Sequence, residues 1–396
     1  MQIKHWRPIN NLETENSEMK VAKLLFINEN LKSERNDENL EYYEVQLVIG
    51  FGTRSIIEKE SFFILLKEKF PNAEIALSSS SGEIFCNEVY DGAVVLTAIS
   101  FSRSSLKTSQ IDIEDFSDSY DAGKKLIENL PSEGLRWVFI MSDGNKVNGS
   151  QLVSGLNSSR PEKVLISGGL AGDGDKFEKT VVGLNQVPQP NKILAVGFYG
   201  EHLELSHSSI GGWESFGLER IVTKSQDNVL YEIDNKNALD LYKKYLGKYA
   251  EELPGSALLF PLSLKLSRDL SPVVRTILSI KDNTMIFAGD LPEGSQVRFM
   301  KANMDKLIDA ANDAANECLQ MTQHNIKLGI IISCVGRKIV LADRVYEEVD
   351  IVRDVFKSNT ALIGFYSYGE LSPLSSFGNC ALHNQTITIT TVNEIE

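Results

Sequence analysis

A unit of strand, loop, helix and strand occurs three times in this sequence and restricts its fold more than any other feature. In each copy a short apolar run is followed by a loop, by apolar residues at helical spacing, and by a second apolar run. Strand, helix and return strand are predicted at residues 45–49, 56–70 and 74–77; at 137–141, 150–157 and 163–166; and at 328–333, 346–356 and 361–363. The loops after the first strands are 50–54, 142–145 and 334–337. This alternation predicts an α/β protein.

Each return strand leads into a turn of small residues that carries an acid. The turns are residues 79–83, 167–173 and 366–370. In a right-handed crossover the two strands are parallel, so the loop and the turn emerge at the same edge of the sheet. Open α/β sheets bind ligands at that edge. We therefore expect a small-molecule site where the three turns meet, whereas each turn taken alone is equally well explained as a tight connection in which Gly82 or Gly369 supplies a positive φ.

The remaining segments are antiparallel in character. A hairpin is predicted from 192–200 and 202–208, and a second from 273–280 and 284–287. The last strand, 384–392, alternates with a period of two and places Ile387 and Ile389 on one face. The clearest helix is 303–323, and a domain boundary is expected near 224–228. The expected fold class is thus α/β with two domains, in which mixed sheets are built from repeated β-loop-α-β units with antiparallel additions.

Composition excludes several classes of function. The 396 residues include 40 Lys and Arg against 54 Asp and Glu, a formal net charge of −14, which disfavours nucleic acid as a partner. No apolar run approaches the roughly 20 residues of a membrane span, and the N-terminus has no apolar core of a signal peptide, so a cytoplasmic protein without membrane insertion is expected. The four cysteines are widely separated, which indicates buried, reduced thiols rather than disulfides or zinc ligands.

Several residues have the chemistry of a site for a small ligand. The glycine-rich run 168–174 is suited to an amide nest, and Asp173 suits an ammonium group. Arg54 and Arg337 occupy equivalent loops and are candidates to bind a carboxylate. Cys334 ends a predicted strand beside Arg337, so it is either a nucleophile, with His383 as its base, or a buried core residue. No two histidines have metal-ligand spacing, but a single one can still bind haem.

The chain resembles the FIST family, a sensory module of bacterial signal transduction with an N-terminal and a C-terminal domain. The motifs that carry the resemblance are SGEI at 81–84, GGLAGD at 168–173, CVGR at 334–337, GFYSYGE at 364–370 and HNQT at 383–386. The serine run 78–81 departs from the family, whose members often have a cysteine there. The resemblance implies an N-terminal extension over 1–27, a FIST N-terminal domain over 28–224 and a FIST C-terminal domain over 225–396.

The resemblance implies a sensor, not an enzyme, that binds a small molecule such as an amino acid and regulates a partner such as a histidine kinase of a two-component system. No output domain is recognised in the chain, so the output is expected in that partner. Arg275 or Arg337 would bind an anionic group of the ligand. The residues expected at the ligand site are Arg54, Gly82, Glu83, Gly168, Gly169, Asp173, Arg275, Cys334, Arg337, Tyr366, Tyr368, Gly369, Glu370, His383 and Asn384. The alternatives are a haem-based sensor of nitric oxide, with His383 or His207 as axial ligand, and a Cys334-dependent enzyme.

Overall fold

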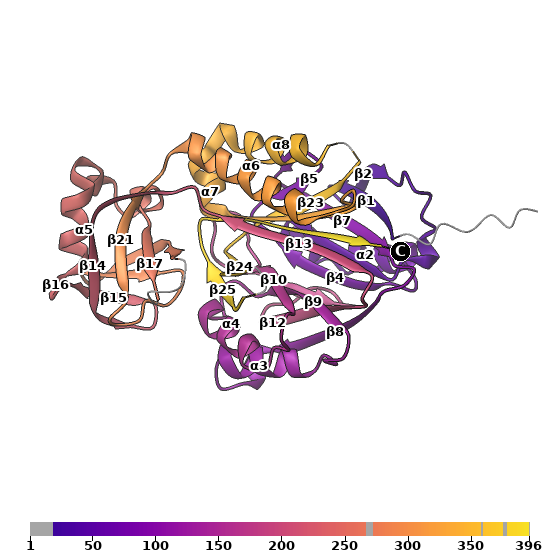
Figure 1. Ribbon diagram of the computed structural model, residues 1–396, viewed down its shortest axis with the longest axis horizontal. Coiled ribbons are helices and arrows are strands. Elements are labelled where there is room, and N and C mark those ends of the chain that lie inside the picture. Colours follow the sequence, from indigo (N-terminus) through magenta and orange to yellow (C-terminus); the bar gives the residue numbers. More distant parts are fainter. Residues whose placement is uncertain (1–18, 267–271, 358, 375–377, 396) are drawn as a thin grey trace, which may run out of the picture.

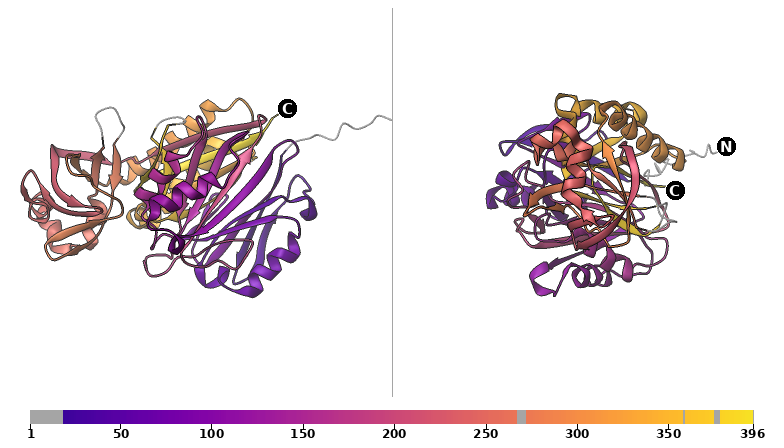
Figure 2. Two further views of the ribbon diagram at one scale, coloured as in Figure 1. Left: turned by 90° about the horizontal axis from the view of Figure 1, so that it is seen from below. Right: turned by 90° about the vertical axis from the view of Figure 1, so that its left-hand side faces the viewer.

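The computed structural model describes residues 19–266, 272–357, 359–374 and 378–395. A large body of sheets and helices carries a smaller unit at one end (Figures 1 and 2). The large body contains three six-stranded mixed sheets, which we call the first, second and third sheets. Among the described residues, no helix combines the length and the apolar character that a bilayer crossing requires.

Each six-stranded sheet contains one parallel pair from one of the three repeated units. The first sheet has the order β11 (Val182–Leu184), β4 (Glu74–Ser79), β3 (Leu47–Gly52), β7 (Ala93–Ser100), β1 (Lys20–Ile27) and β2 (Asn30–Arg35). The second has β25 (Cys380–His383), β24 (Gly369–Pro373), β10 (Leu165–Leu170), β9 (Leu135–Ser142), β12 (Lys192–Tyr199) and β8 (Ser105–Asp112). The third has β13 (Leu203–Ile210), β26 (Ile387–Glu394), β22 (Leu328–Cys334), β23 (Ala361–Ser367), β5 (Glu83–Phe85) and β6 (Glu88–Tyr90). The parallel pairs β3–β4, β9–β10 and β22–β23 confirm the predicted repeat and the α/β class.

Alternating side chains on the central strands separate an inner core from three outer ones. On β9, Trp137 and Phe139 belong to a core shared by all three sheets, whereas Val138 and Ile140 face the helices of their own repeat. Those helices are α3 (Ser119–Glu128) and α4 (Gly149–Ser158); the first sheet is covered by α1 (Arg54–Ile57) and α2 (Glu60–Lys69), and the third by α6 (Met304–Met321), α7 (Val335–Leu341) and α8 (Val345–Phe356). Helices therefore lie outside and the inner sheet faces pack together (Figure 1).

In each repeat the next strand of the six-stranded sheets after the return strand pairs with a neighbouring sheet. β5 follows β4 in the chain but pairs with β23 of the third sheet. β11 follows β10 but pairs with β4 of the first sheet, and β24 follows β23 but pairs with β10 of the second. The three exchanges form a closed cycle, so each sheet is completed by another repeat.

The smaller unit is inserted between β13 and α6 of the third repeat. Its strands are β14 (Glu214–Gln226), β15 (Val229–Ile233), β16 (Lys236–Asn237), β17 (Leu262–Lys265), β18 (Val273–Arg275), β19 (Ile277–Lys281), β20 (Thr284–Phe287) and β21 (Gln296–Lys301), and α5 (Ala238–Leu246) packs on them. It has a hydrophobic core largely of its own. The expected boundary at 224/225 falls within β14, and β1 lies within the expected extension 1–27, whose first 18 residues are outside the described ones.

Several local predictions are confirmed and three are wrong. α6 forms as expected, and Ile387 and Ile389 share one face of β26. The hairpin predicted from 273–280 and 284–287 forms in part: β19 pairs with β20, whereas 273–275 is the separate strand β18, which pairs with β17. Residues 192–200 and 202–208 do not form a hairpin, because both edges of β12 are already occupied by β8 and β9, and β13 pairs with β26 instead. The predicted loop 334–337 is mostly the first turn of α7, and the predicted helix 56–70 is interrupted between α1 and α2.

Candidate functional site

The three turns after the return strands meet, as the repeat predicts. Their main chains are joined by a cycle of three hydrogen bonds, which we call the backbone ring. These bonds run from the Ser81 N–H to the Tyr366 carbonyl (2.8 Å), from the Gly172 N–H to the Ser79 carbonyl (3.1 Å) and from the Tyr368 N–H to the Leu170 carbonyl (3.1 Å). Each repeat thus donates one bond and accepts one, which brings the turns of Gly82, Gly169 and Gly369 to a common junction.

Glycines allow close packing at and beside the junction. A Cβ at Gly172 would overlap the side chain of Ser81, and one at Gly168 would overlap the carbonyl of Ile140. Gly168 also has a φ of +151°, a conformation that other residues rarely adopt. Of the two cavities described below, neither is lined by the turn residues. The small residues of the turns therefore let the repeats approach one another, and a ligand site at the turns stays a prediction.

The acids Glu83 and Glu370 are bound by their own turns. Ser80 Oγ donates to Glu83 at 2.5 Å, and Ser367 Oγ donates to Glu370 at 2.6 Å, so the first and third repeats have the same Ser–Glu arrangement. Glu370 also accepts bonds from the N–H and hydroxyl of Thr386 (3.2 and 2.9 Å). Burial raises the pKa of each carboxyl to about 7. Both acids are therefore buried, and both accept hydrogen bonds from nearby donors of the protein.

Asp173 and the two expected tyrosines are also engaged inside the protein. The hydroxyl of Tyr368 donates to the carboxylate of Asp173, and its ring stacks on Phe177 with centroids 4.4 Å apart. Asp173 Oδ2 accepts the N–H of Lys179 at 2.9 Å, which closes this loop on itself. Tyr366 is fully buried and its hydroxyl donates to Glu348 Oε2 at 3.0 Å. None of these three side chains lines either cavity described below.

Two of the three candidate arginines have carboxylate partners in the protein. Arg337 and Glu348 form an ion pair at 2.6 Å with both side chains fully buried. The Nε of Arg337 donates to Glu348 Oε1 (2.7 Å), Nη1 to the carbonyl of Gly211 (2.5 Å) and Nη2 to that of Leu307 (2.7 Å). Arg54 lies 3.7 Å from Glu58 one turn along α1. The ion pair and the carbonyl bonds occupy the Arg337 guanidinium, which does not support its predicted role as a ligand fork.

Cys334, His383 and Asn384 are buried at the end of β22 and around the end of β25. Burial raises the pKa of the Cys334 thiol well above its ordinary range, which opposes a role as a nucleophile. Burial, and then the charge of Arg275, lowers the pKa of His383 to about 4, and its Nε2 lies 3.1 Å from the carbonyl of Ser372. The amide groups of Asn384 and its neighbour Gln385 are fully buried without a hydrogen-bond partner among the described residues. Gln385 was not singled out from the sequence.

Of the residues expected at the ligand site, Arg275 lines one of the two cavities described here. This cavity, which we call the Arg275 cavity, measures about 580 Å³ and lies between the smaller unit and the helix α4 and strand β25 of the large body. Arg275 is 3% exposed, and its Nε and Nη1 donate to main-chain carbonyls only. The cavity is lined by Tyr120, Ser150, Gln151, Val153, Ser154, Asn157, Leu266, Arg275, Asp290, Pro292, Leu374, Asn379, Cys380, Ala381 and Leu382.

Sequence reasoning missed the other polar residues of the Arg275 cavity. Asp290 accepts a hydrogen bond from Asn148 Nδ2 at 3.0 Å, and its N–H donates to Ser150 Oγ at 3.1 Å. These bonds connect the loop after β20 to the start of α4. One signal for Asp290 was its position directly before the LPEG sequence at 291–294.

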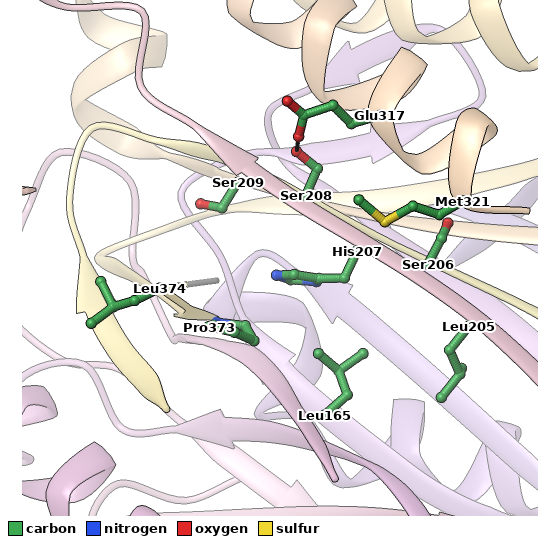
Figure 3. Close-up of a pocket in the computed structure, with 10 residues that line it drawn as sticks. All are labelled: Leu165, Leu205, Ser206, His207, Ser208, Ser209, Glu317, Met321, Pro373 and Leu374. Carbon is green, nitrogen blue, oxygen red and sulfur yellow. Dashed lines mark hydrogen bonds between the residues drawn. The ribbon is translucent and has the colours of Figure 1, made fainter. Parts of the chain in front are cut away.

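A second cavity of about 570 Å³, the His207 cavity, lies between β13, α6 and the end of β24. Figure 3 shows the His207 imidazole projecting into it, with leucines on one side and Glu317 on α6 on the other. Ser208 Oγ donates to Glu317 at 2.6 Å. The two nitrogens of His207 lie 2.9 Å from Thr390 Oγ1 and 2.8 Å from Ser372 Oγ. Burial lowers the pKa of His207 to about 3, so its imidazole is neutral at pH 7.

The residues present do not fit an axial haem ligand. Haem iron needs a free imidazole nitrogen, whereas both ring nitrogens of His207 lie within hydrogen-bond distance of hydroxyl groups. His383 is buried and lines neither of the two cavities. In the part of the chain that the structure describes, no group of three or more His, Cys, Asp or Glu side chains is arranged to hold a metal ion. All four cysteines are free and buried, as the sequence predicts.

Comparison with known proteins gives a family for almost the whole described chain. The sequence profile of the FIST N domain matches residues 46–236, and that of the FIST C domain matches residues 238–373. An uncharacterized protein of Methanocaldococcus jannaschii is 22% identical over 348 residues, a match that spans 80% of this chain and 64% of that protein.

Two solved structures have a weak overall likeness to this chain. A chorismatase has a TM-score of 0.36 at 9% identity, covering 95% of this chain and 99% of its own. A cyanuric acid hydrolase from A. caulinodans has a TM-score of 0.38 at 7% identity, covering 96% and 99%. Likenesses of this size do not establish a shared activity.

Proposed function

The chain belongs to the FIST family, whose domains are sensory, ligand-binding signalling domains, and from this premise we propose that it senses a small carboxylate, such as an amino acid, that binds in the Arg275 cavity. The observation that carries the proposal is a buried guanidinium at a cavity wall without a carboxylate partner. Arg337, which is equally buried, has Glu348 as its counter-ion, whereas the hydrogen bonds of Arg275 go to main-chain carbonyls.

A buried charge without a counter-ion is costly, and this cost is what a ligand would relieve. Burial lowers the pKa of Arg275 to about 10, and the charge of Asp290 opposes this shift without cancelling it. Nη2 takes part in none of the three carbonyl bonds and is left to bind a ligand. A ligand carboxylate at this nitrogen would add a charge-assisted hydrogen bond.

The lining of the Arg275 cavity fits a small molecule with charges of both signs. Its volume lies in the range of roughly 300–1,000 Å³ that is usual for small-molecule sites. Asp290 lies on the same wall and would bind an ammonium group of the ligand. Hydroxyl and amide groups from α4, including Ser154 and Asn157, supply neutral donors and acceptors. Leu382 and Pro292 also line the cavity and would contact an apolar side chain of the ligand.

The position of the cavity connects binding to signalling. Arg275 and Asp290 belong to the smaller unit, whereas α4 and β25 belong to the large body, so one ligand would contact both parts. Binding would then favour one relative position of the two parts over others. A partner protein, such as a histidine kinase, would read that position.

The proposal is tested by isothermal titration of the full chain against the common amino acids and small dicarboxylic acids. We expect one of these classes to bind wild-type protein and Arg275→Met to weaken it at least 100-fold. The matched control is Glu317→Gln in the His207 cavity, which should bind as wild type does. Circular dichroism and the Tm establish that both variants fold.

Two results would contradict the proposal. The first is that no carboxylate binds the folded wild-type protein. The second is that Glu317→Gln loses binding while Arg275→Met retains it, because the ligand would then occupy the His207 cavity.

A further inference from the structure

β13 is an edge strand whose outer side runs along the His207 cavity. Among the described strands it pairs with β26 alone, in an antiparallel ladder. Five consecutive residues of β13, 205–209, line the cavity. Because the side chains of a strand alternate between its two faces, a cavity lined by every residue of such a run lies along the edge of the strand.

The main chain of β13 is unpaired on that outer side. The N–H of Ile395 donates to the carbonyl of His202 (2.8 Å), so these two residues form a hydrogen-bonded pair of the ladder. Bonded and non-bonded pairs alternate along an antiparallel ladder, so the N–H and C=O groups of Leu205, His207 and Ser209 point away from β26. Across the described ranges these groups have no hydrogen-bond partner. They are the groups that an added strand would bind.

The other edge strands of the six-stranded sheets are protected against pairing. β2 carries Lys32 and Arg35, and β8 carries Lys107. The edge strands β6, β11 and β25 have only three or four residues each. Short length and charges, lysine above all, are the devices by which proteins keep a sheet edge from pairing. β13 has eight residues and neither Lys nor Arg, so its edge is open to a partner.

The two faces of the His207 cavity differ in chemistry. On the α6 face, Glu317 Oε2 accepts the hydroxyl of Ser208, and no Lys, Arg or His that the structure describes forms an ion pair with this carboxylate. On the other face lie Leu165, Pro373 and Leu374 (Figure 3). An added strand would place alternate side chains on these two faces. Basic side chains would fit the first face and apolar side chains the second.

The charge on α6 favours a basic partner over a second copy of this chain. Asp309, Asp313 and Glu317 follow one another at intervals of four residues, so they lie on one side of the helix, and all three are exposed. Two copies joined edge to edge through β13 would bring these acids close to their own equivalents. A net charge of −14 also favours encounter with a positively charged protein.

We propose that the free edge of β13 is a docking site for an extended segment of a partner protein, in which Lys or Arg alternates with apolar residues. The segment adds a strand to the third sheet, and its main chain bonds to Leu205, His207 and Ser209. Its basic side chains reach Glu317, and its apolar side chains pack on Leu374 and the other residues of that face. This docking does not depend on a ligand in the Arg275 cavity.

The test is the binding of synthetic peptides to the full-length protein, measured by fluorescence anisotropy. The peptides have eight residues, in which Lys or Arg alternates with Val, Leu or Phe. We expect at least one of them to bind, and the same peptide with Glu in place of its basic residues to bind at least 100-fold more weakly.

Methylated peptides separate strand addition from attraction between charges, because methylation removes an amide donor and keeps the charge. Methylating every second amide nitrogen of the bound peptide should abolish binding for one alternate set and leave it within threefold for the other. Loss with the apolar set indicates antiparallel addition, and loss with the basic set indicates parallel addition.

Two pairs of protein variants test the site itself. Glu317→Lys should weaken binding at least tenfold, whereas Glu251→Lys, the same charge change at an exposed acid of the smaller unit, should not. Ser209→Pro removes an N–H on the free edge and should also weaken binding at least tenfold, whereas Ser209→Ala keeps that N–H and should not. Circular dichroism and the Tm establish that each variant folds.

Three results would overturn the proposal. The first is that none of the basic peptides binds the wild-type protein. The second is that the two methylated sets bind equally, a comparison that needs no protein variant and so holds if Ser209→Pro fails to fold. The third is dimerisation of the protein in sedimentation experiments that Ser209→Pro abolishes and Ser209→Ala does not, because a second copy would then occupy the edge.

Discussion

Arg337 and Glu348 form an ion pair that is completely enclosed, with a nitrogen–oxygen distance of 2.6 Å and no exposure of either side chain. Removing one partner leaves the other charge buried without a counter-ion. We expect Arg337→Met to lower the free energy of unfolding by about 3–5 kcal/mol, measured by urea denaturation. The control is Arg344→Ala, which breaks exposed pairs with Asp305 and Glu347 and should cost far less. An equal loss of unfolding free energy in the two variants would contradict the enclosure of the Arg337–Glu348 pair.

The hydroxyl of Tyr368 joins the third repeat to the second through Asp173 and the N–H of Phe177. Tyr368→Phe keeps the ring stack and removes only this hydroxyl. The buried groups left unsatisfied should lower the free energy of unfolding by roughly 1–3 kcal/mol. Tyr346→Phe, at a tyrosine that is 53% exposed, should change it by less than about 0.5 kcal/mol. A wild-type stability for Tyr368→Phe would mean that water replaces these bonds.

Gly168 has both a φ of +151° and a neighbouring carbonyl where a side chain would lie. Gly168→Ala should therefore lower the free energy of unfolding by more than about 2 kcal/mol. Gly134 also has a positive φ, of +73°, but open space around it. Gly134→Ala should cost about 1 kcal/mol, from the conformation alone. Thermal and urea unfolding of the two variants measure the difference, and a similar cost for both would show that the backbone at Gly168 relaxes.

Glu370 makes part of the stability depend on pH. Burial raises its pKa in the folded chain from 4.5 to about 7, so the native state holds a proton that the unfolded state releases. Its contribution to stability is complete below pH 4.5 and is lost as the pH rises towards 7. Glu370→Gln cannot ionise, so the free energy of unfolding of wild type minus that of the variant should decrease over this range.

His207 and His383 contribute the opposite slope, because burial lowers the pKa of each and acid destabilises the fold through them. Both proteins contain these histidines, so the difference isolates Glu370. A difference that stays constant from pH 4.5 to 7 would contradict a raised pKa for Glu370.

The parallel strand pairs could be predicted because their signal is local. In β22 the apolar residues are continuous and a helix with a clear apolar face follows in the same repeat. The exchange of β5, β11 and β24 could not be predicted in this way. β5 and β11 have only three residues each, and a strand's partner is set by which sheet edge remains free, which no local pattern records.

In the candidate site too, only the features with a local signal could be predicted from the sequence. The sequence predicts that the turns of the repeats meet, but it does not show that Gly172 packs directly against Ser81. Arg275 and Arg337 look alike as buried arginines, and only the packing of α7 on α8 shows that Glu348 neutralises one of them. Asp290 was missed because it becomes a neighbour of Arg275 only when the smaller unit meets α4.

The exchange of strands among the three sheets has a consequence for how the chain acquires its structure during synthesis. β5 emerges early from the ribosome, yet its partner β23 lies near the other end of the chain, and β10 likewise waits for β24. The nascent N-terminal part therefore keeps open sheet edges until the last repeat is made. A fragment cut between residues 236 and 238, where the two family profiles meet, would retain those edges permanently and is expected to aggregate.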